Sequence, residues 1–216
     1  MALKDNLSTT VQTDAHYDKI SKSRGRVYPN QVTVYHQGDP LNGFFRVNSG
    51  VVMVYRLLED SQRQITGFYT EGDCFGLSAG GTYQDTAVTV ATSNIVSLMM
   101  SDVRKSVSLQ SELLTITCGQ LSAAQDLITT LTKKTASEKV ATFLLMQAKS
   151  QKKSGDDFDI RLPMSRLDIA DYLGLSIETV SRRFTELKSK GIIALPNRNT
   201  AKICHFAKLK SLAGVT

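Results

Sequence analysis

The sequence predicts an α+β protein with three parts: an N-terminal antiparallel β-roll of the jelly-roll (double-stranded β-helix) type, a long helix, and a C-terminal winged helix-turn-helix. Short apolar segments broken by turns predict an antiparallel roll or barrel, and the resemblance given below makes it a β-roll. A switch to helical periodicity near residue 101 predicts the long helix, and two short helices joined at Gly174 predict the last part. The expected boundaries are 1–27 for an N-terminal arm, 28–101 for the roll, 102–136 for the long helix and 137–216 for the winged helix-turn-helix.

Positive charge is concentrated at the C-terminal end of the chain. Residues 1–160 carry 16 lysines and arginines against 16 acidic residues, whereas residues 161–216 carry ten against four. The net charge of +6 therefore belongs to the last quarter of the sequence. A basic module attached to a neutral one is typical of a nucleic-acid reader.

The composition argues against a membrane, secreted or metal-binding protein. No apolar run approaches the length of a membrane span, and the N-terminal MALKDNLSTT lacks the apolar core of a signal peptide. We therefore expect a cytoplasmic protein with no membrane partner. Cys74, Cys118 and Cys204 are scattered and make no metal-ligand pair, so we expect reduced, structural thiols, no metal site and no cofactor.

The N-terminal half contains an arm followed by many short strands. The arm is polar and without periodicity, apart from a short helix expected around residues 15–22. Turn signals such as Gly38-Asp39 and Gly72-Asp73 separate the apolar segments, a spacing typical of an antiparallel roll or barrel. The expected strands are Val32–Tyr35, Phe44–Val47, Val51–Leu57, Ile65–Tyr69 and Asn94–Met100.

The long helix carries a narrow apolar seam. Its members repeat every seven residues in two series offset by three, which is the a/d pattern of a coiled coil. The series are Leu114, Leu121 and Ile128, and Thr117, Ala124 and Leu131. We favour a homodimer interface at this seam over a helix that packs only on its own roll. Cys118 lies beside the seam, where an intersubunit disulfide is disfavoured in the cytoplasm.

The C-terminal segment begins with a hinge at Thr135–Glu138, where Ser137 is the expected cap of the next helix. Helical spacing then predicts two short helices separated by Gly174, with Ser176 as the N-cap of the second. The apolar segments Ile192–Leu195 and Ala201–Cys204 flank a turn and predict a β-hairpin, hence a wing. A last helix is expected at Phe206–Leu212.

The second short helix has a buried stripe and a polar face with the chemistry of base reading. Arg182 suits a guanine edge, Glu178 suits the amino group of a cytosine, and Ser181 suits either kind of edge. The alternative is a solvated face on which Glu178 and Arg182, four residues apart, form a pair worth ~0.3–0.5 kcal/mol. The tight helix–turn–helix framework favours base reading. Candidate phosphate contacts are Arg166, Thr179, Arg183, Lys188, Arg198 and Lys202.

The segment GLSIETVSRRFTELKSKGII resembles the recognition region of the Crp/FNR superfamily of bacterial transcription regulators. The Glu-x-x-Ser-Arg pattern at Glu178, Ser181 and Arg182 is that of the FNR branch, and LPMSRLDIADYLGLSIETVSR is similar to FixK-type regulators. The resemblance implies a non-enzymatic homodimer that binds double-stranded DNA at a palindrome with TTGAT or TTGAC half-sites and contacts RNA polymerase, chiefly as an activator. It further implies control of low-oxygen, denitrification or nitrogen-fixation genes.

The resemblance also implies that the roll is a sensor domain. Its residues argue against two of the family's ligands. In cAMP-binding members a Glu and an Arg-Ser pair follow the Gly-Asp turn. Here Leu77 or Ser78, and Asp85-Thr86, stand at those places, and a carboxylate facing a phosphate is repulsive, so no cyclic nucleotide is expected. The arm has no cysteine, which argues against the iron–sulfur cluster of FNR proper.

Other ligands and activities remain alternatives. One is a regulator gated by haem, nitric oxide or another small molecule, with His36 as a candidate haem ligand. Another is a cupin-like enzyme, which is disfavoured because His16 and His205 lie outside the roll. Cys204, near the expected DNA-binding surface, is a candidate oxidation switch.

Overall fold

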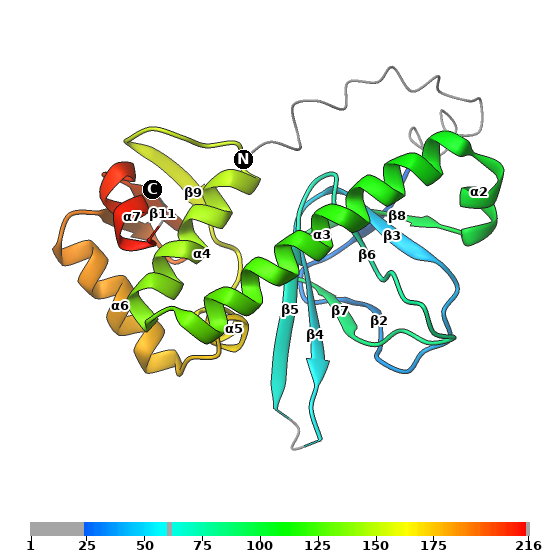
Figure 1. Ribbon diagram of the computed structural model, residues 1–216, viewed down its shortest axis with the longest axis horizontal. Coiled ribbons are helices and arrows are strands. Elements are labelled where there is room, and N and C mark those ends of the chain that lie inside the picture. The colour runs from blue at the N-terminus through cyan, green and yellow to red at the C-terminus, as the bar shows by residue number, and fades with distance from the viewer. Residues whose placement is uncertain (1–23, 60–61, 215–216) are drawn as a thin grey trace.

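The computed structural model describes residues 24–59 and 62–214 and confirms the predicted fold class. A β-roll, a long helix and a helix-turn-helix module with a small sheet follow one another along the chain (Figure 1). The helix expected around residues 15–22, and most of the predicted arm, lie outside the described residues. None of the described helices is both long and apolar enough to cross a bilayer.

The roll consists of two four-stranded antiparallel sheets. The first has the order β1 (Arg26–Tyr28), β8 (Ser93–Leu98), β3 (Phe44–Ser49), β6 (Cys74–Phe75). The second has the order β2 (Thr33–Tyr35), β7 (Thr86–Thr89), β4 (Val52–Leu57), β5 (Arg63–Tyr69). The sequence did not predict β1, β6 and β7, which are only two to four residues long and show too little alternation. β1 begins within the segment 1–27 that we expected to be an arm.

Stacked aromatic rings fill the inside of the roll. The rings of Tyr35 and Tyr83 stack with centroids 3.9 Å apart, and Phe45 and Phe75 extend the stack at 5.3 Å from each other. The Tyr83 hydroxyl donates a hydrogen bond to the Gly43 carbonyl at 2.9 Å, which satisfies the polar tip of a buried ring. The roll therefore has a solid interior with its own core.

The predicted long helix is interrupted once. α2 (Met100–Lys105) ends at Ser106, whose backbone is extended and whose side chain accepts from the Leu109 N–H to cap α3 (Val107–Lys133). One face of α3 packs through Leu109, Leu113 and Ile116 on the outer side of the first sheet. The opposite face is left open to solvent.

The C-terminal module is built from four helices and a three-stranded sheet. Its elements are α4 (Ala136–Ser150), β9 (Phe158–Arg161), α5 (Arg166–Leu173), α6 (Ile177–Ser189), β10 (Ile193–Asn197), β11 (Thr200–Ile203) and α7 (Phe206–Leu212). The predicted wing is the hairpin β10–β11, and β9 pairs with β11 as a third strand. The expected cap Ser137 is wrong: Thr135 caps α4, because Thr135 and Glu138 form a reciprocal capping box.

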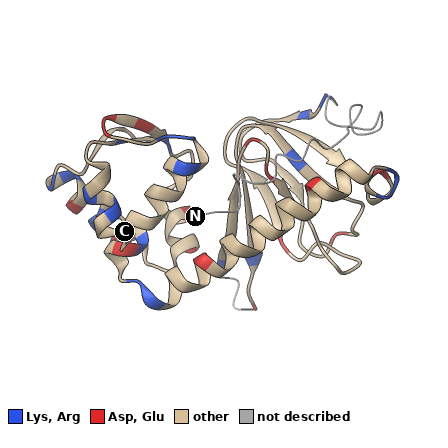
Figure 2. Ribbon diagram, turned by 45° about the horizontal axis from the view of Figure 1, so that its top comes forward, with Lys and Arg blue, Asp and Glu red and all other residues tan. Residues whose placement is uncertain are grey.

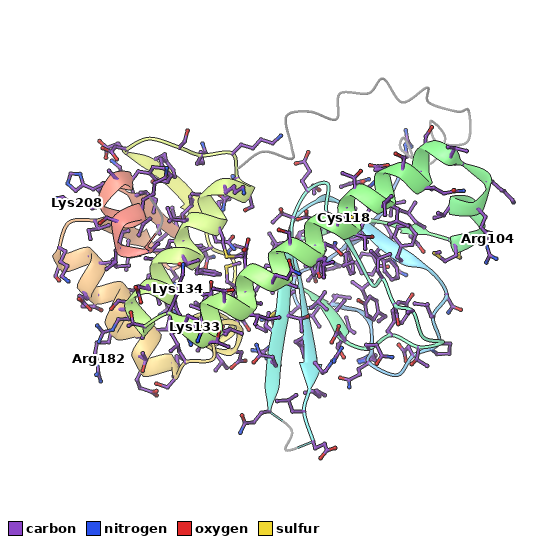
Figure 3. All side chains as sticks on the ribbon, in the orientation of Figure 1. Arg104, Cys118, Lys133, Lys134, Arg182 and Lys208 are labelled. Carbon is purple, nitrogen blue, oxygen red and sulfur yellow. The ribbon has the colours of Figure 1, made fainter. Side chains whose placement is uncertain are left out.

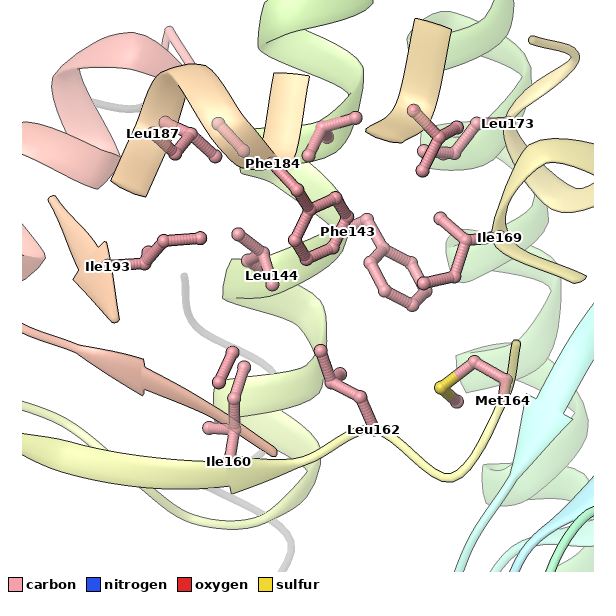
Figure 4. Packing of buried hydrophobic residues seen from close by; sticks show 14 of the residues in the cluster. Phe143, Leu144, Ile160, Leu162, Met164, Ile169, Leu173, Phe184, Leu187 and Ile193 are labelled. Atoms are coloured by element: carbon pink, nitrogen blue, oxygen red, sulfur yellow. The ribbon is translucent and has the colours of Figure 1, made fainter. Parts of the chain in front are cut away.

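A single apolar core joins these elements. Phe143 and Leu144 of α4 lie at its centre, fully buried, with Phe184 of α6 and Ile193 of β10 around them (Figure 4). Ile65 of the roll strand β5 belongs to the same buried cluster. The roll and the C-terminal module thus share core, and their relative placement depends partly on apolar packing.

Replacing Phe143 by alanine should lower the stability of the C-terminal module by about 3–5 kcal/mol, because the cavity it leaves is surrounded on all sides. Chemical denaturation followed by circular dichroism measures the loss. Leu167→Ala is the matched control, since Leu167 is 50 % exposed and its truncation should change stability by less than about 1 kcal/mol. Equal effects of the two changes would contradict the central place of Phe143.

Candidate nucleic-acid interface

Local hydrogen bonds define both helices of the helix-turn-helix. A capping box between Ser165 and Asp168 starts α5; sequence reasoning missed it, although the Ser-x-x-Asp spacing was visible. α5 ends at Gly174, whose φ of +60° lies in the left-handed region that favours glycine. Ser176 then accepts from the Thr179 N–H at 3.2 Å and caps α6, as the sequence predicted.

α6 presents two distinct faces. Val180, Phe184 and Leu187 are buried in the module's core. Glu178, Ser181 and Arg182 are exposed in the first two turns. Figure 3 shows Arg182 pointing outward at the edge of the module, as a side chain that enters a groove would. The structure therefore places the three predicted base-reading residues on one open surface.

The charged groups of this surface are available to a ligand. Among residues 24–59 and 62–214, no salt bridge joins Glu178 to Arg182, so the alternative intrahelical pair is not formed. Hydrogen bonds from its own backbone N–H and from the Ser176 side chain lower the pKa of the Glu178 carboxyl. Glu178 is thus an ionised acceptor and Arg182 an uncommitted donor with two parallel N–H groups.

The predicted phosphate contacts fall into two groups. Lys188 and Arg198 are exposed, and neither side chain has a hydrogen-bond or ion-pair partner within the described part of the chain. Thr179 is half-buried, and its hydroxyl shares a 3.0 Å hydrogen bond with Ser176.

The other three predicted phosphate contacts have partners inside the protein. The Arg166 guanidinium stacks 3.6 Å above the centroid of the Phe184 ring, and burial lowers its pKa. Arg183 donates to Ser137 and Glu186, and Lys202 pairs with Asp157 at 2.9 Å. Figure 2 shows Lys and Arg residues spread over the module's helices and loops.

The predicted seam lies on the face of α3 that turns away from the roll. Leu114, Leu121 and Ile128 are 60–66 % exposed, an unusual state for large apolar side chains in a regular row. Val107, 78 % exposed, extends the row by one heptad, which the same seven-residue period could have revealed. Thr117 and Ala124 are also exposed.

Leu131 differs from the rest of the seam. It is half-buried, and its side chain lies close to Gly174 in the turn of its own helix-turn-helix. The C-terminal end of the seam therefore lies against the helix-turn-helix of the same chain.

The place in the roll where the resemblance puts a cyclic phosphate has its own ion pair. Asp85 borders a small opening together with Tyr35, Tyr69 and Gln120. The Arg56 Nε donates to its carboxylate at 2.9 Å. Burial and the nearby Asp85 charge raise the pKa of Tyr69 to about 12. The opening thus presents a carboxylate and neutral phenols, a poor match for a phosphate.

The residues considered for binding haem or a metal, or for redox chemistry, do not form a common site among the described residues. His36 is exposed at the end of β2, outside the roll's interior. No group of three His, Cys, Asp or Glu side chains suited to a metal occurs among the described residues. Cys74 is buried, which raises its pKa to about 12, and Cys204 is half-buried with its Sγ 3.8 Å from the Lys202 carbonyl oxygen.

Known proteins resemble the chain over nearly its whole length. Residues 138–212 match the Crp-like helix-turn-helix domain, and residues 25–108 match the cyclic nucleotide-binding domain. The nitrogen fixation regulation protein FixK of Rhizobium meliloti (strain 1021) is 37 % identical over 179 residues, covering 83 % of this chain and 82 % of that protein. The transcriptional activator protein FnrA of Stutzerimonas stutzeri is 33 % identical over 221 residues, covering 96 % and 87 %. The structure of FixK2 from Bradyrhizobium japonicum superposes with a TM-score of 0.80 at 32 % identity, covering 88 % of this chain and 97 % of that one.

Replacing Ser176 by alanine should destabilise the module by about 1 kcal/mol, because the N–H groups at the start of α6 lose their acceptor. Thermal unfolding measures the change. Ser154→Ala in the exposed loop before β9 is the control and should have no effect. If both variants melted like the parent, the cap would contribute nothing to the recognition helix.

Proposed function

The chain belongs to the Crp/FNR family of DNA-binding transcription regulators, and we propose that it acts as a homodimer that binds a palindrome of the FNR/FixK type. The observation that carries this proposal is the exposed pair Glu178 and Arg182 at the start of α6, ionised and free of each other. The family is not enzymatic, so the cupin-like enzyme considered above is set aside.

Base reading in this proposal depends on three side chains. Arg182 donates two hydrogen bonds to the O6 and N7 of a guanine, and Glu178 accepts from the N4 amino group of a cytosine. Ser181 bonds or packs beside them. Such a G·C pair occurs in half-sites of the TTGAT or TTGAC kind. The N-terminal turns of α6 are the part of a recognition helix that reaches the groove floor.

Phosphate contacts set affinity and register. Lys188 and Arg198 are exposed and free to neutralise phosphates, and Thr179 sits at the helix N-terminus, where anions are favoured. Arg166, Arg183 and Lys202 are already held by protein groups. Because a guanidinium has five N–H donors, Arg183 and Arg166 retain donors for a phosphate while they keep these partners.

The dimer in this proposal forms along α3. The open row of Leu114, Leu121 and Ile128, with the small residues Thr117 and Ala124, allows two helices to approach closely. Leu131 would close the seam at its C-terminal end. Two recognition helices then fit successive major grooves ~34 Å apart on one face of the duplex.

We infer the regulatory role from the names of the relatives. Relatives named as FixK and as transcriptional activators support a role as an activator that contacts RNA polymerase and controls low-oxygen, denitrification or nitrogen-fixation genes. The Arg56–Asp85 pair supports a roll without a cyclic nucleotide. The alternative is a regulator whose roll must bind another small molecule in the opening beside Tyr69. An oxidation switch at Cys204 stays a prediction, and a peroxide-insensitive complex would count against it.

Binding of the purified protein, without added effector, to a TTGAT palindrome and to a scrambled duplex tests the proposal. Measured at two salt concentrations, selective binding supports an effector-independent regulator. Weak binding that is equal on both duplexes and lost with salt shows only the phosphate contribution. That result would favour the gated alternative or a different half-site.

Arg182→Ala should cost about 1–3 kcal/mol on the palindrome and relax selectivity at one base pair, because a bidentate base contact is lost. Fluorescence anisotropy with duplexes substituted at each half-site position measures both effects. Lys188→Ala is the control and should weaken every duplex by a similar factor, since phosphates carry no sequence. Full affinity and unchanged selectivity of Arg182→Ala would refute the assignment.

Leu121→Glu should convert the dimer to a monomer, because two carboxylates would face each other at the centre of the seam. Analytical ultracentrifugation measures the mass, and affinity for the palindrome should fall with it. Thr115→Glu places the same charge on an exposed position outside the two seam series and should leave the dimer intact. A dimeric Leu121→Glu variant would place the interface elsewhere.

A further inference from the structure

An arginine of the roll forms hydrogen bonds and ion pairs with the first helix of the helix-turn-helix. Arg63 on β5 donates from Nη2 to Asp168 Oδ1 at 2.7 Å and to Asp171 Oδ2 at 2.7 Å, and from Nε to Asp171 Oδ2 at 2.9 Å. Side-chain exposures are 25 % for Arg63, 14 % for Asp168 and 22 % for Asp171, so water screens the cluster only in part. One guanidinium thus bridges both carboxylates of α5.

Neighbouring contacts run along the same strand. The Gln64 side-chain amide donates to the Asp171 carbonyl at 2.9 Å. Phe68 lies four residues after Gln64 on β5, and its ring packs against the Tyr172 ring with centroids 5.3 Å apart. Polar and apolar contacts therefore join β5 to α5 over the length of both elements, and α5 in turn packs on α6.

The covalent connection between the two parts is short and not helical. α3 ends at Lys133. The next two residues are extended, Lys134 with φ −94° and ψ 145° and Thr135 with φ −67° and ψ 163°, before α4 begins. Rotation at these two residues would swing the whole C-terminal module relative to α3. The backbone of these two residues does not prevent such a rotation. Noncovalent contacts between the roll and the C-terminal module must therefore fix the orientation.

We propose that Arg63 is a positioning residue for DNA binding: its bonds to Asp168 and Asp171 hold α5 and α6 at the angle to α3 at which two recognition helices match two half-sites. The inference rests on the proposed binding of a palindrome by a dimer. It adds a residue of the roll, more than 100 positions away in sequence from its partners, to the determinants of DNA recognition.

Two properties of DNA binding separate this role from simple support of the fold. Binding both half-sites at once requires both modules in the competent orientation, so apparent affinity falls in proportion to the fraction of competent dimers. Binding a single half-site requires no fixed relation between the modules. Loss of Arg63 should therefore weaken binding to a palindrome and spare binding to one half-site.

Arg56 provides a matched control on the same hairpin. It lies on β4, beside β5, and pairs with Asp85 of the same domain at the surface of the roll. Arg56→Gln removes an arginine–aspartate pair of similar distance without touching the C-terminal module. Arg63→Lys keeps the positive charge but not the planar set of guanidinium donors. Its affinity for the palindrome should therefore lie between those of the parent and Arg63→Gln.

The experiment uses the full-length dimer with Arg63→Gln, Arg63→Lys and Arg56→Gln, and measures fluorescence anisotropy on three kinds of duplex. These are the palindrome, the palindrome with one half-site scrambled, and palindromes with one base pair added to or removed from the spacer. Arg63→Gln should lower the affinity for the palindrome about tenfold, as expected if about a tenth of the dimers keep both modules in the orientation that binds two half-sites. It should stay within about twofold of the parent on the single half-site, and its preference among spacers should flatten.

Parent-like affinity and spacer preference of Arg63→Gln would overturn the proposal. So would an equal loss on the palindrome and the single half-site, since that pattern means a damaged helix-turn-helix. Arg56→Gln should match the parent throughout, and an effect as large as that of Arg63→Gln would also count against the proposal. If the parent fails to distinguish the palindrome from scrambled DNA, the proposed half-site is wrong, which is a separate failure.

A measurement without DNA keeps the inference testable in that case. Ser189 is exposed at the end of α6, and Ser189→Cys, with Cys118→Ser and Cys204→Ser, accepts one spin label per protomer. The distribution of distances between the two labels in the dimer should be narrow with Arg63 and broad with Arg63→Gln. Distributions of equal width would overturn the proposal independently of any DNA sequence.

Discussion

The burial of α4 against the recognition helix, the wing and the roll is the interaction on which the rest of this structure depends. Phe143 and Leu144 are fully excluded from water, and the side chains around them come from α5, α6, β10 and β5. Apolar packing of this kind is dense and tolerates little displacement. It orients the buried stripe of α6 inward, and the opposite face, with Glu178 and Arg182, must then point to solvent.

A second constraint is the division of α3 into two apolar faces. The inner face covers the roll through Leu109 and Leu113, and the outer row with Leu114 and Leu121 is exposed, without a partner among the residues that the structure describes. Exposed leucines in a regular row are costly in water, so a second copy is the natural cover for them. The same helix thus connects the roll, the exposed apolar row and, at Leu131, the turn of the helix-turn-helix.

The roll has the family's architecture, an aromatic interior and an ion pair at its surface. An aromatic stack fills its centre, and Arg56 already neutralises Asp85 at the place where a cyclic phosphate would be expected. With Arg56 as its partner, the Asp85 carboxylate needs no cationic ligand. Contacts of Arg63 with Asp168 and Asp171 also join the roll to α5 without any ligand.

Local patterns in the sequence determined the helix-turn-helix, the cap at Ser176, the exposed face of α6 and the seam of α3, because helical period and capping depend on residues only three to seven positions apart. Only the tertiary structure decided the pairing of β1, β6 and β7, whose short segments carry no period of their own. It also decided which cations remain free for DNA: Arg166 stacks on Phe184 and Arg183 bonds Ser137, while Lys188 stays open. The same holds for Arg63 and Asp171, which meet across more than 100 residues, since such contacts arise only when the whole chain packs and leave no periodic trace in the sequence.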